Sequence, residues 1–337
     1  MTPRERIAQA IAHRESDICP YVLTFEGDVR QHLVAHIGDT YFDREVELHI
    51  ETTGPSYPNT DERVDAQHYR DAFGVVWTES VRGELGVVID PILKGPSLEG
   101  YTFPPVRVPG LFDDMSDHCS RNPDRFVMWR LRCSLFERAW SLRGFEAFLM
   151  DMVQAPEFVD DLLDGICAFN LGMIERACRF PIDCVGFSDD YGAQRGLILS
   201  PELWRRFIKP RLAKMVGAAA SYGKVTFLHS DGDIRAIVPD LIEVGLTILN
   251  PIQPDCMDIY ALKRTYGRDL TFWGGISVQH LLPNGSPDAV RSEVRRLLRE
   301  MGAGGGFIAA PTNLLGPDIP PENAVALIEE LTRQVSG

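Results

Sequence analysis

The chain has 337 residues, of which 45% are hydrophobic and 24% charged, so it is long enough to bury a large core. Its 34 basic and 48 acidic residues give a formal net charge of -14, which argues against a general affinity for nucleic acid or an anionic membrane. No segment approaches the roughly 20 apolar residues of a membrane span, and the seven cysteines form no CxxC motif. We expect a soluble, cytoplasmic protein with neither a disulfide framework nor a zinc ribbon.

The first half of the chain combines helix and strand patterns with a long irregular stretch. The sequence pattern predicts a helix over 2–13, a strand over 20–26 and a second helix over 28–37. The next clear strand covers 126–133. Between them, residues 54–125 are rich in Pro, Gly, Asp and Tyr, and we interpret this stretch as an insertion.

Two apolar runs within the insertion predict a β-hairpin. The runs are Val75-Val76-Trp77 and Val87-Val88-Ile89. Between them lies Arg82-Gly83-Glu84, around which we expect the hairpin to turn.

The second half alternates regularly between strand and helix patterns. Short apolar runs predict five strands, at 184–188, 224–229, 246–250, 269–273 and 305–310. Helices are predicted over 156–179, 200–221, 233–244, 258–266 and 287–301, with a closing helix that starts at 320–322. This repetition requires parallel strands joined by right-handed crossovers.

Seven strands are therefore predicted, and one more, weaker strand would make eight. We favour an α/β fold of the (β/α)8 TIM-barrel type over an open doubly wound sheet, because no glycine fingerprint of a nucleotide site accompanies the helices. No low-complexity tract or charge block marks a linker, so residues 1–337 are expected to form a single domain. The insertion over 54–125 would then lie near the mouth of the barrel.

His229 and Asp231, at the end of the strand over 224–229, are the strongest candidates for chemistry. Residues two apart on a strand point to the same side, and active sites in such barrels lie at the carboxyl ends of the strands. A histidine with a carboxylate can bind a divalent metal, or can transfer protons or contact substrate without one. A structural role, in which His229 satisfies backbone carbonyls beneath the mouth, is the third interpretation. The residues alone leave all three open.

Acidic residues at two other strand ends are further catalytic candidates. Asp189 and Asp190 are adjacent, so at most one of them is expected to face the barrel while the other caps or holds a loop. An inward carboxylate would bind a metal, hold a substrate amine or act as a general acid or base, supported by Tyr191 and Gln194. The alternative is that both aspartates are capping acids. Glu26 ends the first predicted strand in the same way. Polar or aromatic groups expected to contact substrate at the other strand ends are Asn250, Gln253, Trp273 and Asn313.

Arginines on the strand over 126–133 suggest an anion site. Arg130 and Arg132 share one face of that strand because they are two residues apart. We expect both to contact substrate at the mouth. Arg138 and Arg143, in the helical region that follows, are expected to be solvated.

The chain resembles the uroporphyrinogen decarboxylase superfamily, in the branch that includes corrinoid-linked methyltransferases. The resemblance follows the family order over nearly the whole chain, is densest after residue 180, and rests on Arg4-Glu5-Arg6, Ser188-Asp189-Asp190, Ser200-Pro201-Glu202-Leu203-Trp204, His229-Ser230-Asp231-Gly232-Asp233, Leu249-Asn250-Pro251, Phe272-Trp273-Gly274-Gly275-Ile276 and Gly305-Gly306-Phe307-Ile308. It implies a TIM-type barrel with the active site at the C-terminal mouth.

Two departures from the family pattern bear on the reaction. Decarboxylases of uroporphyrinogen carry an arginine-rich segment after the first strand, whereas this chain has Glu26 and Asp28 there, with Arg30 alone to neutralise an octacarboxylate. The methyltransferase branch has a His-x-Cys pair and a distant Cys as zinc ligands. This chain has His229-x-Asp231 instead, and Pro311-Thr312-Asn313 near the last strand. Such a ligand set is harder than thiolates and suits Zn, Mn or Fe.

The resemblance implies, as the leading interpretation, methyl or other one-carbon transfer to a small molecule, with a metal or the His229/Asp231 pair activating the acceptor. Zinc or another divalent metal held by these two residues, a methyl-corrinoid donor and a corrinoid protein as partner are expected, and a site without a cofactor is the alternative. Decarboxylation of uroporphyrinogen or another carboxylated substrate, with Asp190 stabilising a protonated intermediate, is the second interpretation. The third is non-catalytic binding of a corrinoid or tetrapyrrole. The sequence does not fix the oligomeric state, a homodimer being one option.

Overall fold

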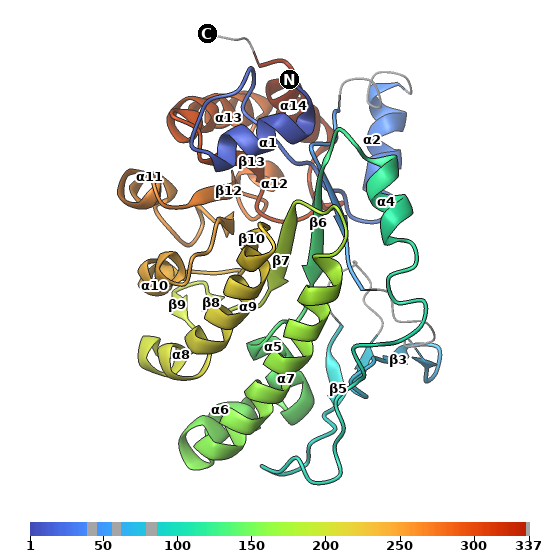
Figure 1. The fold of residues 1–337 in the computed structure, drawn as a ribbon. Helices are drawn as coiled ribbons and strands as arrows, with labels where there is room; N and C mark the ends of the chain where they lie inside the picture. Colours follow the sequence, from blue (N-terminus) through green and yellow to red (C-terminus); the bar gives the residue numbers. More distant parts are fainter. Residues whose placement is uncertain (39–45, 56–61, 79–85, 335–337) are drawn as a thin grey trace.

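Residues 1–38, 46–55, 62–78 and 86–334 are described by the computed structural model of the chain (Figure 1). Their main element is a parallel sheet in which strands that follow one another along the chain are neighbours. The seven strands of this sheet, in order, are β1 (Ile50–Thr53), β6 (Phe126–Leu131), β7 (Cys184–Ser188), β10 (Val225–His229), β11 (Ile248–Ile252), β12 (Thr271–Ile276) and β13 (Phe307–Pro311). Because all neighbours are parallel, their carboxyl ends lie at one edge, which we call the mouth.

Six of the seven predicted strands are confirmed, whereas the one predicted over 20–26 is not a continuous strand. This segment runs beside β13 and the loop after it, and forms two single-residue bridges, Tyr21 with Ala309 and Phe25 with Leu315. The two bridges are therefore four residues apart in the segment 20–26 but six residues apart in β13 and the loop after it. The extra residues belong to the loop that follows β13, and they interrupt the ladder between the two bridges.

Two further expectations are corrected by the structure. Strand β1 was not predicted, because its sequence Ile-Glu-Thr-Thr contains a single apolar residue, Ile50. The helix predicted over 200–221 is two helices, α8 (Pro201–Phe207) and α9 (Lys209–Ser221). The break lies beside Pro210, whose ring nitrogen has no hydrogen to donate to the preceding turn.

Side-chain caps fix the starts of several helices. The hydroxyl of Thr2 accepts from the amide of Glu5, and Ser200 and Ser286 cap their helices in the same way, each followed by a proline. No helix within the described ranges is both long and apolar enough to cross a bilayer. The remaining helices are α1 (Pro3–Ile11), α2 (Val29–Ile37), α4 (Met115–Arg121), α5 (Phe136–Arg143), α6 (Phe145–Gln154), α7 (Pro156–Ala177), α10 (Val238–Glu243), α11 (Ile259–Tyr266), α12 (Leu281–Asn284), α13 (Pro287–Gly302) and α14 (Pro321–Thr332), with a short 3-10 turn at Arg235–Ile237.

The two faces of the main sheet bury different sets of side chains. One large cluster lies between the strands and the surrounding helices. A smaller cluster on the other face includes Met128, Phe227 and Ile248, together with Ile7 of α1, which lies across the amino ends of the strands (Figure 1). Side chains alternate along a strand, so residues two positions beyond this inner cluster continue the same face toward the mouth.

The insertion between β1 and β6 contains a four-stranded antiparallel sheet. Its strands are β2 (Glu62–Arg63), β3 (His68–Arg70), β4 (Val76–Thr78) and β5 (Val88–Asp90), paired in that order. Strands β4 and β5 pair where the hairpin was expected, and the turn expected at Arg82-Gly83-Glu84 lies outside the described residues. A two-residue antiparallel pair, β8 (Gly192–Ala193) with β9 (Gly196–Leu197), follows β7.

The insertion is tied to α5, the helix that follows β6, by a buried ion pair. Arg138 donates to Asp71 at 2.5 Å and stacks over the ring of Phe73, with its guanidinium carbon 4.1 Å from the ring centroid. Arg143, at the end of α5, donates to Asp151 at 2.8 Å. The expectation that these arginines are solvated is wrong, because both serve as internal ion-pair partners.

Candidate active site

Asp190, His229 and Asp231 meet at the mouth. One ligand atom from each lies within 4.8 Å of the other two, and all three residues are partly exposed. His229 ends β10 beside Ser188 of β7, so the residues that follow the two strands are also neighbours. The amide of Asp231 donates to Oδ1 of Asp190 at 2.9 Å. The strand ends thus bring together three of the four residues that the sequence proposed as catalytic.

Asn250 fixes the orientation and protonation of His229. Its amide nitrogen donates to the carbonyl of Trp273 (3.4 Å), so its Oδ1 faces Nδ1 of His229 at 2.7 Å. Because Oδ1 can only accept, the proton of the neutral ring lies on Nδ1 and the lone pair on Nε2, which is 4.0 Å from Asp231. Burial, followed by the charge of Arg130, lowers the pKa of His229 to about 4. The ring is therefore neutral at physiological pH, as metal binding or proton acceptance requires.

Arg130 brings a positive charge to this group. It lies on β6 two residues beyond Met128 of the inner cluster, and its Nε donates to Oγ of Ser188 at 2.5 Å. Its guanidinium carbon is 5.6 Å from the centroid of the Phe227 ring, one layer below His229. Burial and the neighbouring Arg132 lower the pKa of Arg130 to about 10, so it remains charged at neutral pH.

Glu137 is a candidate that sequence reasoning missed. It lies in the first turn of α5, is 7% exposed, and interacts electrostatically with Asp189, Asp190 and Arg130. Burial, followed by the charges of the two aspartates, raises the pKa of Glu137 to about 9, so its carboxyl carries a proton at neutral pH. A glutamate in the first turn of a helix is common, so nothing in the sequence distinguished it.

Asp189 is structural, which corrects the expectation that it contacts substrate. It is fully buried and accepts from the amides of Leu135, Phe136 and Glu137 at 2.7–3.0 Å, which fixes the start of α5. The hydroxyl of Tyr191, itself 1% exposed, donates to the same carboxylate at 2.9 Å. Tyr191 is therefore a structural partner as well. The predicted division between Asp189 and Asp190 agrees with this geometry.

The two predicted glutamines hold loops near the triad. Gln253 is buried and accepts from the amide of Gly232 at 2.6 Å, which fixes the turn after Asp231. Gln194 is exposed on the β8–β9 pair and donates to Gln279 at 2.9 Å. Gln253 thus acts through the loop that it holds, whereas Gln194 remains accessible.

The other predicted residues are dispersed. Trp273 belongs to the inner cluster, where its ring meets Phe227 edge to face at 5.0 Å, so it forms part of the floor beneath the triad. Arg132 is exposed at the end of β6. Asn313 is exposed and its side chain accepts from the amide of Leu314, while Glu26 lies beside Gly316. Glu26 is not among the three residues whose ligand atoms converge.

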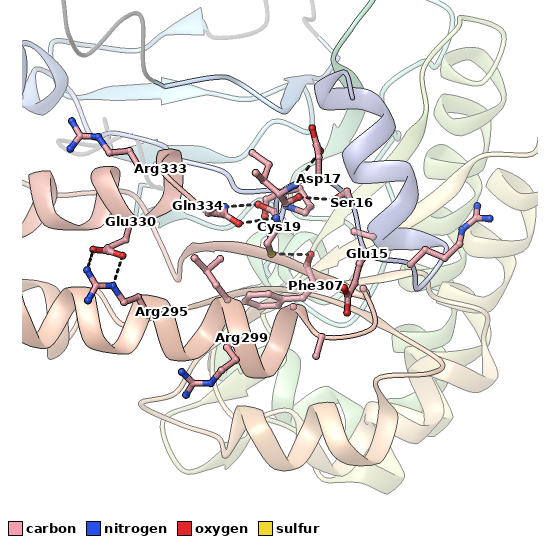
Figure 2. Close-up of a pocket in the computed structure, with 18 of the residues that line it drawn as sticks. Glu15, Ser16, Asp17, Cys19, Arg295, Arg299, Phe307, Glu330, Arg333 and Gln334 are labelled. Atoms are coloured by element: carbon pink, nitrogen blue, oxygen red, sulfur yellow. Dashed lines mark hydrogen bonds and ion pairs between the residues drawn. The ribbon is translucent and has the colours of Figure 1, made fainter. Parts of the chain in front are cut away.

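A cavity of about 1000 Å³ lies at the opposite end of the sheet (Figure 2). Its walls come from residues 14–20, the start of β13, and helices α13 and α14. Arg295 donates twice to Glu330 at its rim, at 2.8 and 2.6 Å. None of the site residues predicted from the sequence is among its described lining residues, so this cavity, which we call the foot cavity, is separate from the triad.

Comparisons with known proteins match the chain to one family. The family described as uroporphyrinogen decarboxylase (URO-D) matches residues 129–334. A uroporphyrinogen decarboxylase of Syntrophotalea carbinolica is 26% identical over 199 residues, which are 59% of this chain and 55% of the relative. The methylcobamide:CoM methyltransferase MtaA of Methanosarcina barkeri is 26% identical over 189 residues, 56% of this chain and 50% of the relative. The chain thus matches about half the length of these curated relatives.

The fold has a counterpart of known structure. A methyltransferase from Methanosarcina mazei superposes with a TM-score of 0.74, with 99% of each chain covered and 18% sequence identity. At this identity the likeness concerns the fold.

Proposed function

The chain belongs to the uroporphyrinogen decarboxylase (URO-D) family, and we propose that it is an enzyme that transfers a methyl or other one-carbon group at Asp190, His229 and Asp231. The observation that carries the proposal is the convergence of these three ligand groups at the mouth, with Nε2 of His229 left without a proton. The methyltransferase relative MtaA supports transfer from a methylcobamide. A corrinoid protein is the corresponding partner.

The donor set fits a divalent cation. One imidazole nitrogen with a lone pair and two carboxylates form a hard ligand set that suits Zn, Mn or Fe. The charges of Asp190 and Asp231 would offset that of the ion, while the nearby Glu137 is protonated. When bound, the ion would supply Lewis acidity that lowers the pKa of an acceptor group coordinated to it.

The surrounding residues would orient the reacting groups. Asn250 holds the His229 ring through Nδ1, and the amide of Asp231 holds Asp190, so the three ligand atoms are positioned before substrate arrives. In the proposed reaction the carbon–cobalt bond of the donor breaks and a new bond forms between the methyl carbon and the acceptor. Cobalt keeps the electron pair of the broken bond, and the acceptor proton passes to solvent.

We also propose that the fold is a closed barrel with a single domain, in which residues 20–26 complete the ring. They bridge to β13 on one side. On the other, the oxygen of Tyr21 accepts from the amide of Glu47, and its ring meets that of His49 just before β1, with centroids 4.5 Å apart. The insertion, tied to α5, would then lie beside the mouth.

A methyl-transfer assay tests the proposed activity. The wild-type protein, reconstituted with zinc or manganese, is mixed with methylcobalamin and coenzyme M, and demethylation is followed by absorbance. We expect turnover that falls at least about 100-fold in His229→Gln. The exposed His36 of α2 supplies a matched control, His36→Gln, which should retain the wild-type rate. Equal rates in His229→Gln and wild type would contradict the assignment.

Decarboxylation is a second candidate, favoured by the electrostatic interaction between Arg130 and a protonated Glu137. The guanidinium would bind a substrate carboxylate, and Glu137 would protonate the carbon from which carbon dioxide leaves. Release of carbon dioxide from a carboxylated pyrrole such as uroporphyrinogen, without methyl transfer in the assay above, would establish this reaction in place of the first.

A further inference from the structure

Three other arginines with largely buried side chains, all within the described part of the chain, are paired with carboxylates. Arg138 bonds Asp71, Arg143 bonds Asp151, and Arg211 bonds both Asp160 and Asp164, all at 2.5–3.0 Å. This is the expected arrangement, because removing an unpaired charge from water costs several kcal/mol. The pairing also fits the composition, since acidic residues outnumber basic ones by 48 to 34.

Arg130 departs from this pattern. Among the described residues, Arg130 donates a hydrogen bond to the neutral hydroxyl of Ser188, and no carboxylate lies within ion-pair distance of it. The inner face of the sheet is nevertheless shaped around it. A Cβ added at Gly186 on the neighbouring strand would lie 3.2 Å from Cγ of Arg130, so the absence of a side chain there makes room for the arginine.

Arg132 adds a second cation near Arg130. It lies in the bend directly after β6, is exposed, and forms no ion pair with any residue in the described part of the chain. Its charge is close enough to lower the pKa of Arg130. Two guanidinium groups that repel each other beside Asp190 and Asp231 would be stabilised by an anion placed between them.

We propose that Arg130 and Arg132 form a subsite for an oxyanion of the substrate, a carboxylate or a phosphate. Arg130 would bind it with the two terminal nitrogens of its guanidinium group, in the paired geometry that planar oxyanions favour. The inference deepens the proposed function, on which its assignment to substrate rests, because it gives the substrate of the triad an anionic group. The rest of the substrate would then extend over Asp190, His229 and Asp231.

Calorimetric titration of the chelator-treated, metal-free protein tests the subsite independently of the metal. Succinate and inorganic phosphate are titrated in separate experiments at constant ionic strength, with chloride as the reference. We expect at least one of them to bind above the chloride background, and the stronger of the two to identify the class of oxyanion. Because no metal is present, failure of the triad to bind a cation would not alter this result.

Three variants of the subsite and one control assign the binding to residues. Arg130→Gln should weaken binding at least about tenfold and Arg132→Gln about threefold. Arg130→Lys, which keeps the charge but loses the paired donors, should fall between wild type and Arg130→Gln. Arg179→Gln, an exposed arginine beyond α7, should bind like wild type. The subsite is refuted if neither anion binds above chloride, or if folded Arg130→Gln binds as tightly as wild type.

Discussion

Charged side chains have different partners at the two ends of the main sheet. At the foot cavity, Arg295 and Arg291 bond Glu330 and Glu329 at 2.6 Å, so these two arginines are neutralised by carboxylates of the cavity wall. At the mouth, Arg130 has a neutral partner and the carboxylates of Asp190 and Asp231 converge on a histidine instead. The foot has a cavity of about 1000 Å³, and the mouth has an arginine with a neutral hydrogen-bond partner close to a convergent histidine and two carboxylates.

The cavity at the foot does not by itself indicate a site for a charged ligand. The ion pairs at the foot stabilise the packing of α13 against α14, so a charged ligand there would add little binding energy. An arginine with a neutral partner would gain more binding energy from a ligand, because an anionic ligand supplies the opposite charge that the protein does not place beside it. We therefore locate function at the mouth, and the following predictions test that distinction.

The largest effect on stability is expected from Asp189, the structural member of the mouth. Asp189→Ala should lower the free energy of unfolding by about 3 kcal/mol or more, because it leaves three amides and the Tyr191 hydroxyl without their acceptor. Asp190→Ala, one residue away, should cost about 1 kcal/mol or less. Urea unfolding of the two variants provides the measurement. Equal losses would mean that Asp190 is also structural.

An intermediate effect, dependent on pH, is expected from Glu137. Its pKa is raised from 4.5 to about 9 by burial and the nearby aspartates, so the folded state binds a proton that the unfolded state releases. The stability due to this proton is full below about pH 4.5 and is lost as the pH rises to about 9.

Glu137→Gln removes this titration and should flatten the pH dependence. Between pH 5.5 and 8.5 the wild type should lose more stability than the variant, by on the order of 4 kcal/mol. Chemical unfolding of both proteins at both pH values measures the two losses of stability. Titrating groups that the two proteins share contribute equally to both losses and cancel in their difference. If the two proteins lose the same stability over this range, Glu137 does not hold the proton.

The smallest effect is expected at the foot. Arg295→Gln breaks a pair whose arginine is 63% exposed, and should cost about 1 kcal/mol or less. It should leave metal binding and anion binding at the mouth unchanged, as measured by calorimetry. A large loss of anion binding in this variant would place a ligand site in the foot cavity and reverse the comparison.

Much of the parallel fold followed from the sequence, because strands such as 184–188 and 224–229 are continuous apolar runs between helices. Strand β1 did not, since Ile-Glu-Thr-Thr becomes a strand only through its parallel pairing with β6. The segment 20–26 has a strong strand pattern, yet its ladder is broken by the loop of its partner β13. Local pattern thus indicated which segments are buried more reliably than how they pair.

The site was predictable where it depends on position along a strand. The alternation of side chains along a strand is enough to place His229 and Asp231 on one face and to point Asp189 and Asp190 in opposite directions. Which aspartate points inward depends on α5, because three amides at its start donate hydrogen bonds to Asp189. The same packing buries Glu137, so its raised pKa has no signal in the sequence. Tertiary contacts of this kind separated structural from functional acids.

Metal binding by the mouth tests the account most directly. Zinc and manganese are titrated calorimetrically into the chelator-treated wild type, His229→Gln and the control His36→Gln. We expect about one ion per wild-type and His36→Gln chain, and at least about 100-fold weaker binding in His229→Gln. Wild-type protein that binds neither ion, or His229→Gln that binds as tightly as wild type, would contradict it.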